Sequence, residues 1–309
     1  MFRRNVLARV LAGLLLLTFA PVCAEPAAPS PASTLAPLPM DLSCGPKPKA
    51  KCFLPEDGGY EDESLSIKIY KDRAYDTNIL YAHIKITHPS QLRTAPASTF
   101  KHKGSHKAAT IAARHHAVLA MNGDYFQFNS ERFIVRQGKL IRNRPTGEDL
   151  LIIDSEGNFH VVQKAHKKDV AAARQAIADA GLSILNAFSF GPALVIDNEA
   201  VFPAQTNYFL TSALKPTQRA VIAQLGPLEY LIVSTEGPED PGSRGLKLCE
   251  AADYTITAAK ALGRPCLYAY NLDGGSSNSL ILGGRKINSP NNPKSRAVSD
   301  IIYFATLVP

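Results

Sequence analysis

The strongest constraint on the fold is a series of short apolar runs that are joined by tight turns. Within each pair, Gly, Pro, Asn or Ser residues separate two runs that are apolar or that alternate between apolar and polar residues. This is the pattern of a β-hairpin. The predicted hairpins join residues 133–136 to 139–141, 150–154 to 159–162 and 219–223 to 230–234, and residues 65–69 and 80–86 are predicted to pair as a hairpin or a meander.

Helix-forming segments are fewer, and they lie at residues 107–116, 170–180 and 246–262. Gly181 and Gly263 follow the last two, as is typical of helix C-termini. Strict alternation of strands with helices is absent, and no G-x-G-x-x-G motif opens a helix, which argues against a nucleotide-binding fold. We therefore predict an α+β fold, a single domain with a mixed, largely antiparallel β-sheet built from hairpins and covered by a few helices.

A polar, glycine-containing turn lies between the apolar runs 266–270 and 280–282. Asp273 precedes Gly274 and Gly275, which lack a Cβ and so allow a ligand to approach the backbone closely. Ser276 and Ser277 add hydroxyl groups. Turn composition alone also fits an ordinary hairpin.

A second apolar run, residues 117–120, leads into a similar polar stretch. It ends in Asn122, Gly123 and Asp124, again an amide, a glycine and a carboxylate. Two such strand exits in one chain predict one shared cleft. Gly191 precedes a proline inside another apolar run, which indicates a sheet edge, a bulge or the lip of a cleft.

Together with residues 190–197 and 296–300, these two exits resemble the phosphodiester glycosidase family, the family with uncovering-enzyme-like N-acetylglucosaminidase domains. The resemblance covers about residues 64–309. It implies hydrolysis of a bond between the anomeric carbon of a sugar and a phosphate, and it favours the cleft lip for Gly191. Asp124 and Ser276 stand where the family usually has glycine, so this site is more polar than the family pattern.

Such a reaction calls for a pair of carboxylates and for arginines that bind phosphate oxygens. Asp273 and Glu236 are the predicted catalytic carboxylates, with Asp124 as the alternate. Arg219 and Arg296 are the predicted phosphate ligands, and a surface ion pair is the alternative for each. A loop-capping role is the alternative for Glu236. The other predicted substrate-binding residues are Asn122, Gly123, Gly191, Gly274, Gly275, Ser276 and Ser277.

Serine nucleophile chemistry is not favoured, because Asn278 stands where a G-x-S-x-G elbow needs its last glycine. No cofactor is predicted. Two alternatives stay open at this point: a non-catalytic glycan-binding or envelope-assembly protein, and a metal-dependent phosphodiesterase. The second would bind a divalent cation through Asp124, Asp273 and Asp300.

The N-terminus predicts export. Three arginines precede the apolar run 10–20, and a small-residue cleavage site ends at Ala24. We expect a signal peptide at residues 1–24, a Pro-rich flexible tether at 25–58 and the glycosidase-like domain at 59–309. The protein would be periplasmic or secreted, with no transmembrane segment after cleavage.

Charge and cysteine content add further expectations. Loss of the three arginines lowers the net charge from +7 to +4, and no basic run is interleaved with aromatic residues, so a nucleic-acid partner is not predicted. The expected partner is a carbohydrate phosphodiester, and no oligomeric state is indicated. Cys44 and Cys52 are close enough in sequence to form a disulfide, whereas a helix separates Cys249 from Cys266.

Overall fold

The computed structural model describes residues 35–100, 103–128, 130–201, 214–289 and 295–309. The predicted signal peptide, residues 1–24, lies outside these residues. The described part of the chain contains three β-sheets and three α-helices, so the predicted α+β class is confirmed. Its strands form three sheets where the sequence predicted one, and all the strand pairs described are antiparallel.

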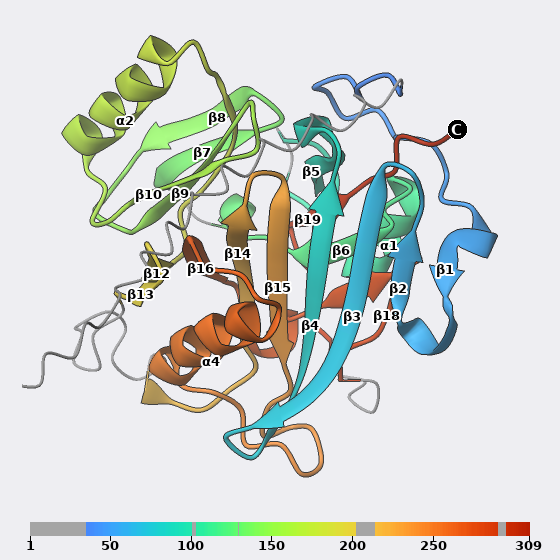
Figure 1. Ribbon diagram of the computed structural model, residues 1–309. Helices are drawn as coiled ribbons and strands as arrows, with labels where there is room; N and C mark the ends of the chain where they lie inside the picture. Colours follow the sequence, from blue (N-terminus) through green and yellow to red (C-terminus); the bar gives the residue numbers. More distant parts are fainter. Residues whose placement is uncertain (1–34, 101–102, 129, 202–213, 290–294) are drawn as a thin grey trace, which may run out of the picture. The chain divides into compact units, whose positions relative to one another are not determined.

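The largest sheet has nine strands and contains two of the four predicted strand pairs (Figure 1). Its central strands are buried along almost their whole length, because both faces of the sheet are covered. In spatial order the strands are β1 (Phe53–Leu54), β2 (Gly59–Glu61), β3 (Leu65–Ala74), β4 (Thr77–Ile86), β15 (Glu229–Thr235), β14 (Ala220–Gly226), β16 (Tyr268–Leu272), β12 (Ala193–Ile196) and β13 (Glu199–Ala200).

Two five-stranded sheets complete the described strands. The first has the order β10 (Phe159–Val162), β9 (Leu150–Asp154), β11 (Ile184–Phe188), β7 (Arg132–Arg136) and β8 (Lys139–Arg144). The second has the order β18 (Arg285–Lys286), β17 (Leu280–Leu282), β6 (Leu119–Asn122), β19 (Asp300–Phe304) and β5 (Leu92–Pro96). Short 3₁₀ turns include η4 (Phe126–Phe128) and η5 (Gly275–Ser277).

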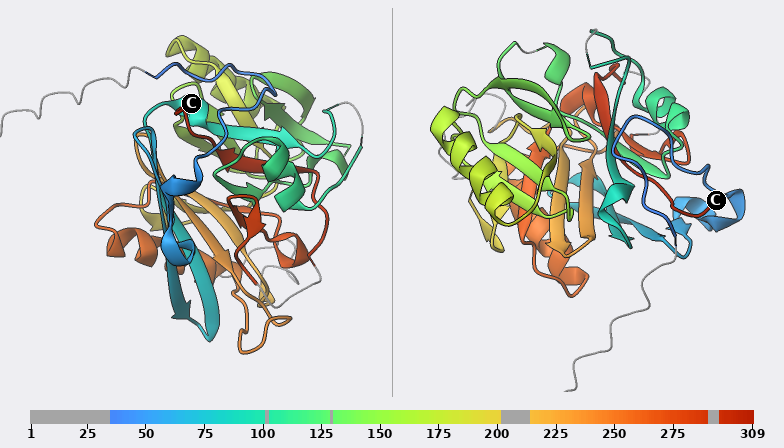
Figure 2. Two further views of the ribbon diagram at one scale, coloured as in Figure 1. Left: turned by 90° about the vertical axis from the view of Figure 1, so that its right-hand side faces the viewer. Right: turned by 90° about the horizontal axis from the view of Figure 1, so that it is seen from above.

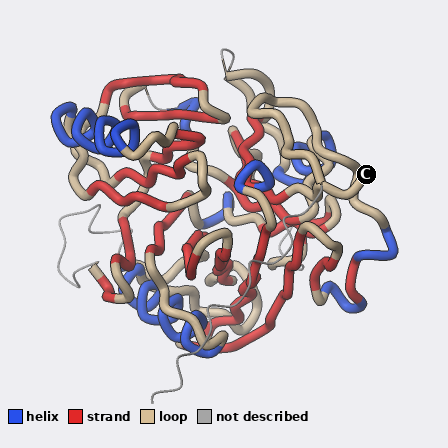
Figure 3. The backbone as a smooth tube through the Cα atoms, turned by 45° about the horizontal axis from the view of Figure 1, so that its top comes forward, coloured by secondary structure: helices blue, strands red, loops and turns tan. Residues whose placement is uncertain are grey.

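Each α-helix packs on a different sheet and lies outside the strand-rich interior (Figures 2 and 3). The helices are α1 (Ala108–Arg114), α2 (Lys167–Asp179) and α4 (Leu248–Ala261), close to their predicted positions. The α4 face that contains Ala252 and Ala259 packs against the nine-stranded sheet. Among the described residues, no helix has both the length and the apolar character that spanning a membrane requires.

The main core lies between the sheets. It joins side chains from all three, among them Ile222 and Tyr270 from the nine-stranded sheet, Phe188 from the first small sheet, and Met121 and Phe304 from the second. All of these are at most 1% exposed. Because burial of apolar surface is the main favourable term in folding, this shared core holds the ends of the strands from different sheets together.

The glycine turn after β16 does not form a hairpin. β16 pairs with β12 and β14 in the nine-stranded sheet, whereas β17 pairs with β6 and β18 in a different sheet. The turn therefore crosses from one sheet to another. Sequence composition cannot distinguish this crossing from a hairpin, because both need glycine and polar residues between two apolar strands.

The described part of the expected tether is held against the domain. Arg93 Nη2 donates a hydrogen bond to Asp41 O at 2.9 Å, and His116 Nδ1 donates one to Gly45 O at 2.9 Å. Residues 53–54 form β1 and pair with β2. The flexible segment predicted at 25–58 is therefore too long at its C-terminal end, because composition does not reveal backbone hydrogen bonds to distant side chains.

The expected disulfide is absent from the described residues. Cys44, Cys52, Cys249 and Cys266 are all unbonded. The thiol of Cys44 instead lies 3.0 Å from the backbone oxygen of Arg114. Burial raises the pKa of Cys266 to about 12, so this thiol stays protonated at neutral pH.

Candidate active site

The two glycine-containing strand exits meet, as the sequence predicts. The Asn122 side chain donates a hydrogen bond from Nδ2 to Asp273 O at 2.7 Å, and its Oδ1 accepts one from Ser279 N at 3.0 Å. One buried amide thus binds both ends of the turn that follows β16. We call the region formed by residues 122–124 and 273–277 the junction.

Packing explains the first glycine of the turn, and conformation explains the second. A Cβ on Gly274 would lie 2.5 Å from Gln218 O, a distance that real side chains do not reach. Gly275 has φ +58° and donates its N–H to Gln218 O at 3.0 Å, while the space where its Cβ would project is open. The turn is therefore fixed against residue 218 on one side and open on the other.

Asp273 is a half-buried carboxyl with an altered acidity. Burial raises its pKa above the usual range, and the charge of Asp124 adds to this rise. The Ser277 hydroxyl and the positive charge of Arg296 act in the opposite direction. A carboxyl of this kind takes up a proton more readily than an ordinary aspartate, as a general base must do.

Arg296 is exposed beside the turn. Its backbone N–H donates to Ser276 O at 2.7 Å, which places the residue next to the glycine turn. The guanidinium acts on Asp273 by charge but forms no ion pair within 4.0 Å among the described residues. The predicted role of Arg296 as a phosphate ligand is compatible with this position.

Asp124 connects the junction to a buried ion-pair cluster. Its Oδ1 lies 2.5 Å from Arg136 Nη2, and its Oδ2 accepts the N–H of Ser189 at 3.2 Å. Arg136 Nε lies 3.0 Å from Asp300 Oδ2. The guanidinium also stacks over the ring of Phe188, with its carbon 4.2 Å from the ring centroid. Both carboxylate oxygens of Asp124 are already bound, one by Arg136 and the other by the N–H of Ser189. The prediction of Asp124 as an alternate catalytic carboxylate is therefore wrong.

Gly123 is explained by the same cluster. A Cβ at this position would lie 2.2 Å from Asp300 Oδ1, and the Gly123 N–H donates to Asp300 O at 3.0 Å. Only glycine leaves room for the buried carboxylate. Burial raises the pKa of Asp300 to about 7; Arg136 opposes this rise and the charge of Asp124 adds to it. Gly123 is thus a packing residue of the junction.

Arg219 does not present its guanidinium as a phosphate ligand. Its Nε donates to Leu246 O at 2.8 Å and its Nη2 donates to Lys215 O at 2.9 Å. The side chain is buried, and burial lowers its pKa to about 10. The predicted role as a phosphate ligand is therefore wrong. The guanidinium instead hydrogen-bonds the backbone carbonyl groups of Leu246 and Lys215 and connects the two loops that contain them.

Gly191 lies beside β16. Its carbonyl accepts a hydrogen bond from Asn271 Nδ2 at 2.8 Å, and its φ of +75° suits glycine. Asn271 lies two residues before Asp273, so the position of Gly191 is compatible with the predicted cleft lip.

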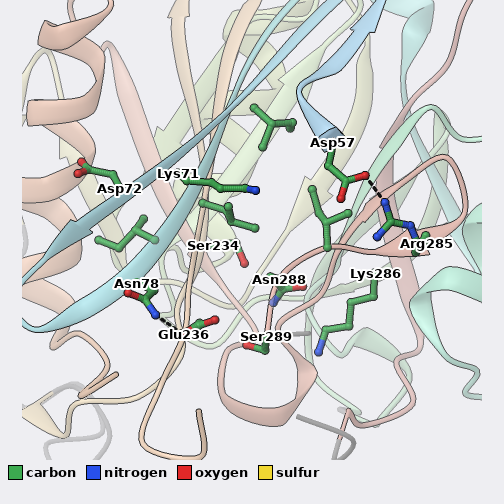
Figure 4. Close-up of a pocket in the computed structure, with 14 residues that line it drawn as sticks. Asp57, Lys71, Asp72, Asn78, Ser234, Glu236, Arg285, Lys286, Asn288 and Ser289 are labelled. Atoms are coloured by element: carbon green, nitrogen blue, oxygen red, sulfur yellow. Dashed lines mark hydrogen bonds and ion pairs between the residues drawn. The ribbon is translucent and has the colours of Figure 1, made fainter. Parts of the chain in front are cut away.

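Glu236 lines a cavity that is separate from Asp273 (Figure 4). Its Oε2 accepts hydrogen bonds from Asn78 Nδ2 at 2.8 Å and from Ser243 Oγ at 2.7 Å. It lines a cavity of about 430 Å³ to which Asp273 does not contribute. The described structure therefore does not support the predicted catalytic pairing of Asp273 with Glu236. Of the two candidate carboxylates in the junction, Asp124 and Asp273, only Asp273 forms no ion pair among the described residues.

Comparison with known proteins assigns the family. The sequence profile of the phosphodiester glycosidase family matches residues 115–305. The chain belongs to this family. The match includes both exits of the junction and the strand that contains Arg136. No curated protein sequence matches the chain significantly.

Two solved structures place this phosphodiester glycosidase family member among known folds. The catalytic domain of zebrafish N-acetylglucosamine-1-phosphodiester alpha-N-acetylglucosaminidase, auto-inhibited by its pro-peptide, has a TM-score of 0.63 and 18% identity, over 81% of this chain and 86% of that one. A hypothetical protein from Synechocystis has a TM-score of 0.52 and 15% identity, over 78% of this chain and 62% of that one. Both establish similarity of fold.

Buried polar atoms that lack partners lie at the junction of this phosphodiester glycosidase family member and on segments next to it. Within the described ranges, four buried oxygens on neighbouring segments have no well-aligned hydrogen bond: Gln218 Oε1, Asp240 Oδ1, Asn271 Oδ1 and Ser277 Oγ. Each such group costs about 1–3 kcal/mol unless water or a ligand bonds to it. Their concentration around the glycine turn suits a polar ligand.

The residues do not fit the metal site of the alternative phosphodiesterase hypothesis. That hypothesis needs the carboxylates of Asp124, Asp273 and Asp300 as ligands of a cation, but the guanidinium of Arg136 lies between Asp124 and Asp300 and binds both. Nor does any group of three His, Cys, Asp or Glu side chains gather at metal-binding distance in the described part of the chain. Arg136 was not singled out by the sequence, although a charged residue at the end of an apolar strand was its one visible signal.

Proposed function

We propose that the protein hydrolyses glycosyl phosphodiesters at the bond between the anomeric carbon and the phosphate oxygen. The observation that carries this proposal is the position of Asp273, half-buried at the junction of two sheets, with a raised pKa and an exposed arginine beside it. Membership of the family supports the same reaction. The predicted signal peptide supports a periplasmic or secreted protein that acts on envelope or extracellular polysaccharide.

The chemistry follows from the leaving group. A phosphate monoester departs readily, so the site needs positive charge for the phosphate more than it needs a strong acid. In the proposed reaction, water bonds to the anomeric carbon and gives a proton to Asp273. The C–O bond breaks, and its electron pair leaves with the phosphate, which Arg296 stabilises. The open side of Gly275 admits the sugar.

Replacing Arg296 with methionine tests the proposed roles of Arg296 and Asp273. We expect kcat/KM to fall about 10- to 100-fold, the effect of losing a hydrogen bond to a charged group. The acid limb of the pH profile should also move to higher pH. Arg296 lowers the pKa of Asp273, so its removal raises that pKa, and more of the base is protonated at a given pH.

The measurement is kcat/KM from pH 4 to 8 in the wild type, in Arg296→Met and in Arg174→Met. Arg174 is an exposed arginine of α2, so its replacement should leave the profile unchanged. An acid limb that stays in place or moves to lower pH in Arg296→Met would count against the proposed pair.

Product analysis tests the function itself. Incubation with N-acetylglucosamine 1-(methyl phosphate) should release free sugar and methyl phosphate in equal amounts, and a chelator should not change the rate. Sugar 1-phosphate and methanol as products would show attack at the other ester bond and overturn the proposal. A complete lack of product with this and other glycosyl phosphodiesters would favour the glycan-binding alternative.

A further inference from the structure

A cavity in the described part of the structure has no junction residue in its lining. Its volume is about 430 Å³, within the range of small-molecule binding sites. One wall consists of residues from β3, β4 and β15, and the other consists of residues 285–289, which include β18 (Figure 4). None of the residues in the family motifs of the two strand exits contributes to it.

Two lysines in this cavity outnumber Glu236, a carboxylate that lines it and forms no ion pair among the described residues. The side chains of Lys71 and Lys286 extend into it (Figure 4), and neither forms an ion pair among the described residues. Two of the three acidic residues at the wall are engaged elsewhere. Asp57 pairs with Arg285, and the Asp72 carboxylate accepts a hydrogen bond from Tyr254 OH at 2.7 Å.

Lys286 is the more deeply placed of the two lysines. Burial lowers its pKa and nearby Lys107 lowers it further, whereas Asp240 opposes both effects. An ammonium that is partly removed from water and lacks a close counter-ion is unfavourable, and a bound anion would relieve that cost.

The rest of the lining suits a sugar ring. Ile69, Leu80 and Ile287 provide an apolar surface for the C–H groups of the ring. Glu236 and Ser234 provide acceptors and donors for hydroxyl groups. A polyhydroxylated ring that also carries a negative charge matches this combination better than an apolar ligand or a cation does.

Hydrogen bonds connect the cavity wall with the junction. Ser234 Oγ donates to Asn278 Oδ1 at 3.0 Å, one residue after the glycine turn. Asp240 Oδ2 accepts from both Ser289 Oγ at 3.0 Å and Gln218 Nε2 at 3.2 Å. The backbone oxygen of Gln218 binds Gly275. The cavity wall and the turn that contains Asp273 therefore belong to one hydrogen-bonded network.

We propose that this cavity binds an acidic sugar unit, a saccharide ring bearing a carboxylate or a phosphate, through Lys71 and Lys286. The inference rests on the proposed function in one respect, since it names an acidic glycan as the substrate class. Binding to the cavity itself requires no hydrolysis, so the two proposals can fail separately.

Calorimetric titration of the intact protein with glucuronic acid, glucose 6-phosphate and glucose tests this inference. At least one acidic sugar should bind at least ten times more tightly than glucose, and the sugar that binds identifies the anion. Lys71→Met and Lys286→Met should each weaken that binding about 10- to 100-fold. Lysine-to-arginine variants should retain much of it, since the charge is kept.

Two matched variants serve as controls. Lys68→Met removes an exposed lysine from the opposite face of the same strand as Lys71, and binding should not change. Asp273→Asn should also bind normally, which separates this site from the proposed catalytic one. Equal affinity for glucose and the acidic sugars, no binding of any of the three, or normal binding in both lysine-to-methionine variants would overturn the inference.

Discussion

Asp273→Asn is expected to lower kcat for a glycosyl phosphodiester by about 10²- to 10⁴-fold, the usual effect of removing a general acid or base. Asparagine keeps the size of the side chain but cannot accept a proton from water. Asp273 is half-buried, and its backbone oxygen, which the substitution leaves in place, makes the hydrogen bond to Asn122. The fold should therefore survive.

The measurement is steady-state kinetics, with thermal unfolding as the check on folding. Asp253→Asn, at an exposed position on α4, is the matched control and should behave like the wild type in both. A kcat for Asp273→Asn within a factor of about three of the wild type would remove Asp273 from the mechanism.

Arg136→Met should reduce the free energy of unfolding by about 3–5 kcal/mol, the typical result of removing one partner from a buried ion pair. The substitution leaves Asp124 and Asp300 facing each other in the interior without a counter-ion. Urea denaturation measures this loss. Arg144→Met on the neighbouring β8 is the control, and as an exposed arginine it should change stability by less than about 0.5 kcal/mol.

The pH dependence of this loss has a definite sign. Burial raises the pKa of Asp300 to about 7, above its value in the unfolded chain. A group of this kind favours the folded state most at low pH, and its contribution is lost as the pH rises through about 7. Removing Arg136 takes away the charge that opposes the rise. Arg136→Met should therefore be closest to wild-type stability near pH 5 and furthest from it near pH 8, and the reverse order would contradict the account.

Local patterns were enough to predict the hairpins, the three helices and the meeting of Asn122 with Asp273. Each depends on residues close together in sequence or on two similar motifs. The path of the glycine turn was not predictable in this way. Whether β17 continues the sheet of β16 depends on its pairing with β6, which is more than 150 residues away.

Arg219 and Arg136 show the same limit of prediction from sequence. Arg219 stands at the end of an apolar strand and suggests a ligand for phosphate, but the carbonyl groups it binds belong to loops that sequence does not place. Arg136 has the same sequence context, and its role is visible only when β7, β19 and the loop after β6 are brought together. A charged residue next to an apolar run thus indicates a position but does not identify the group that it binds.

The position of oxygen-18 in the products tests the central claim most directly. The wild-type protein is incubated with N-acetylglucosamine 1-(methyl phosphate) in labelled water, and both products are examined promptly by mass spectrometry. Attack at the anomeric carbon predicts that the label enters the sugar hydroxyl and that methyl phosphate stays unlabelled. Label in the methyl phosphate would mean that the P–O bond breaks, and it would contradict the role assigned to the junction.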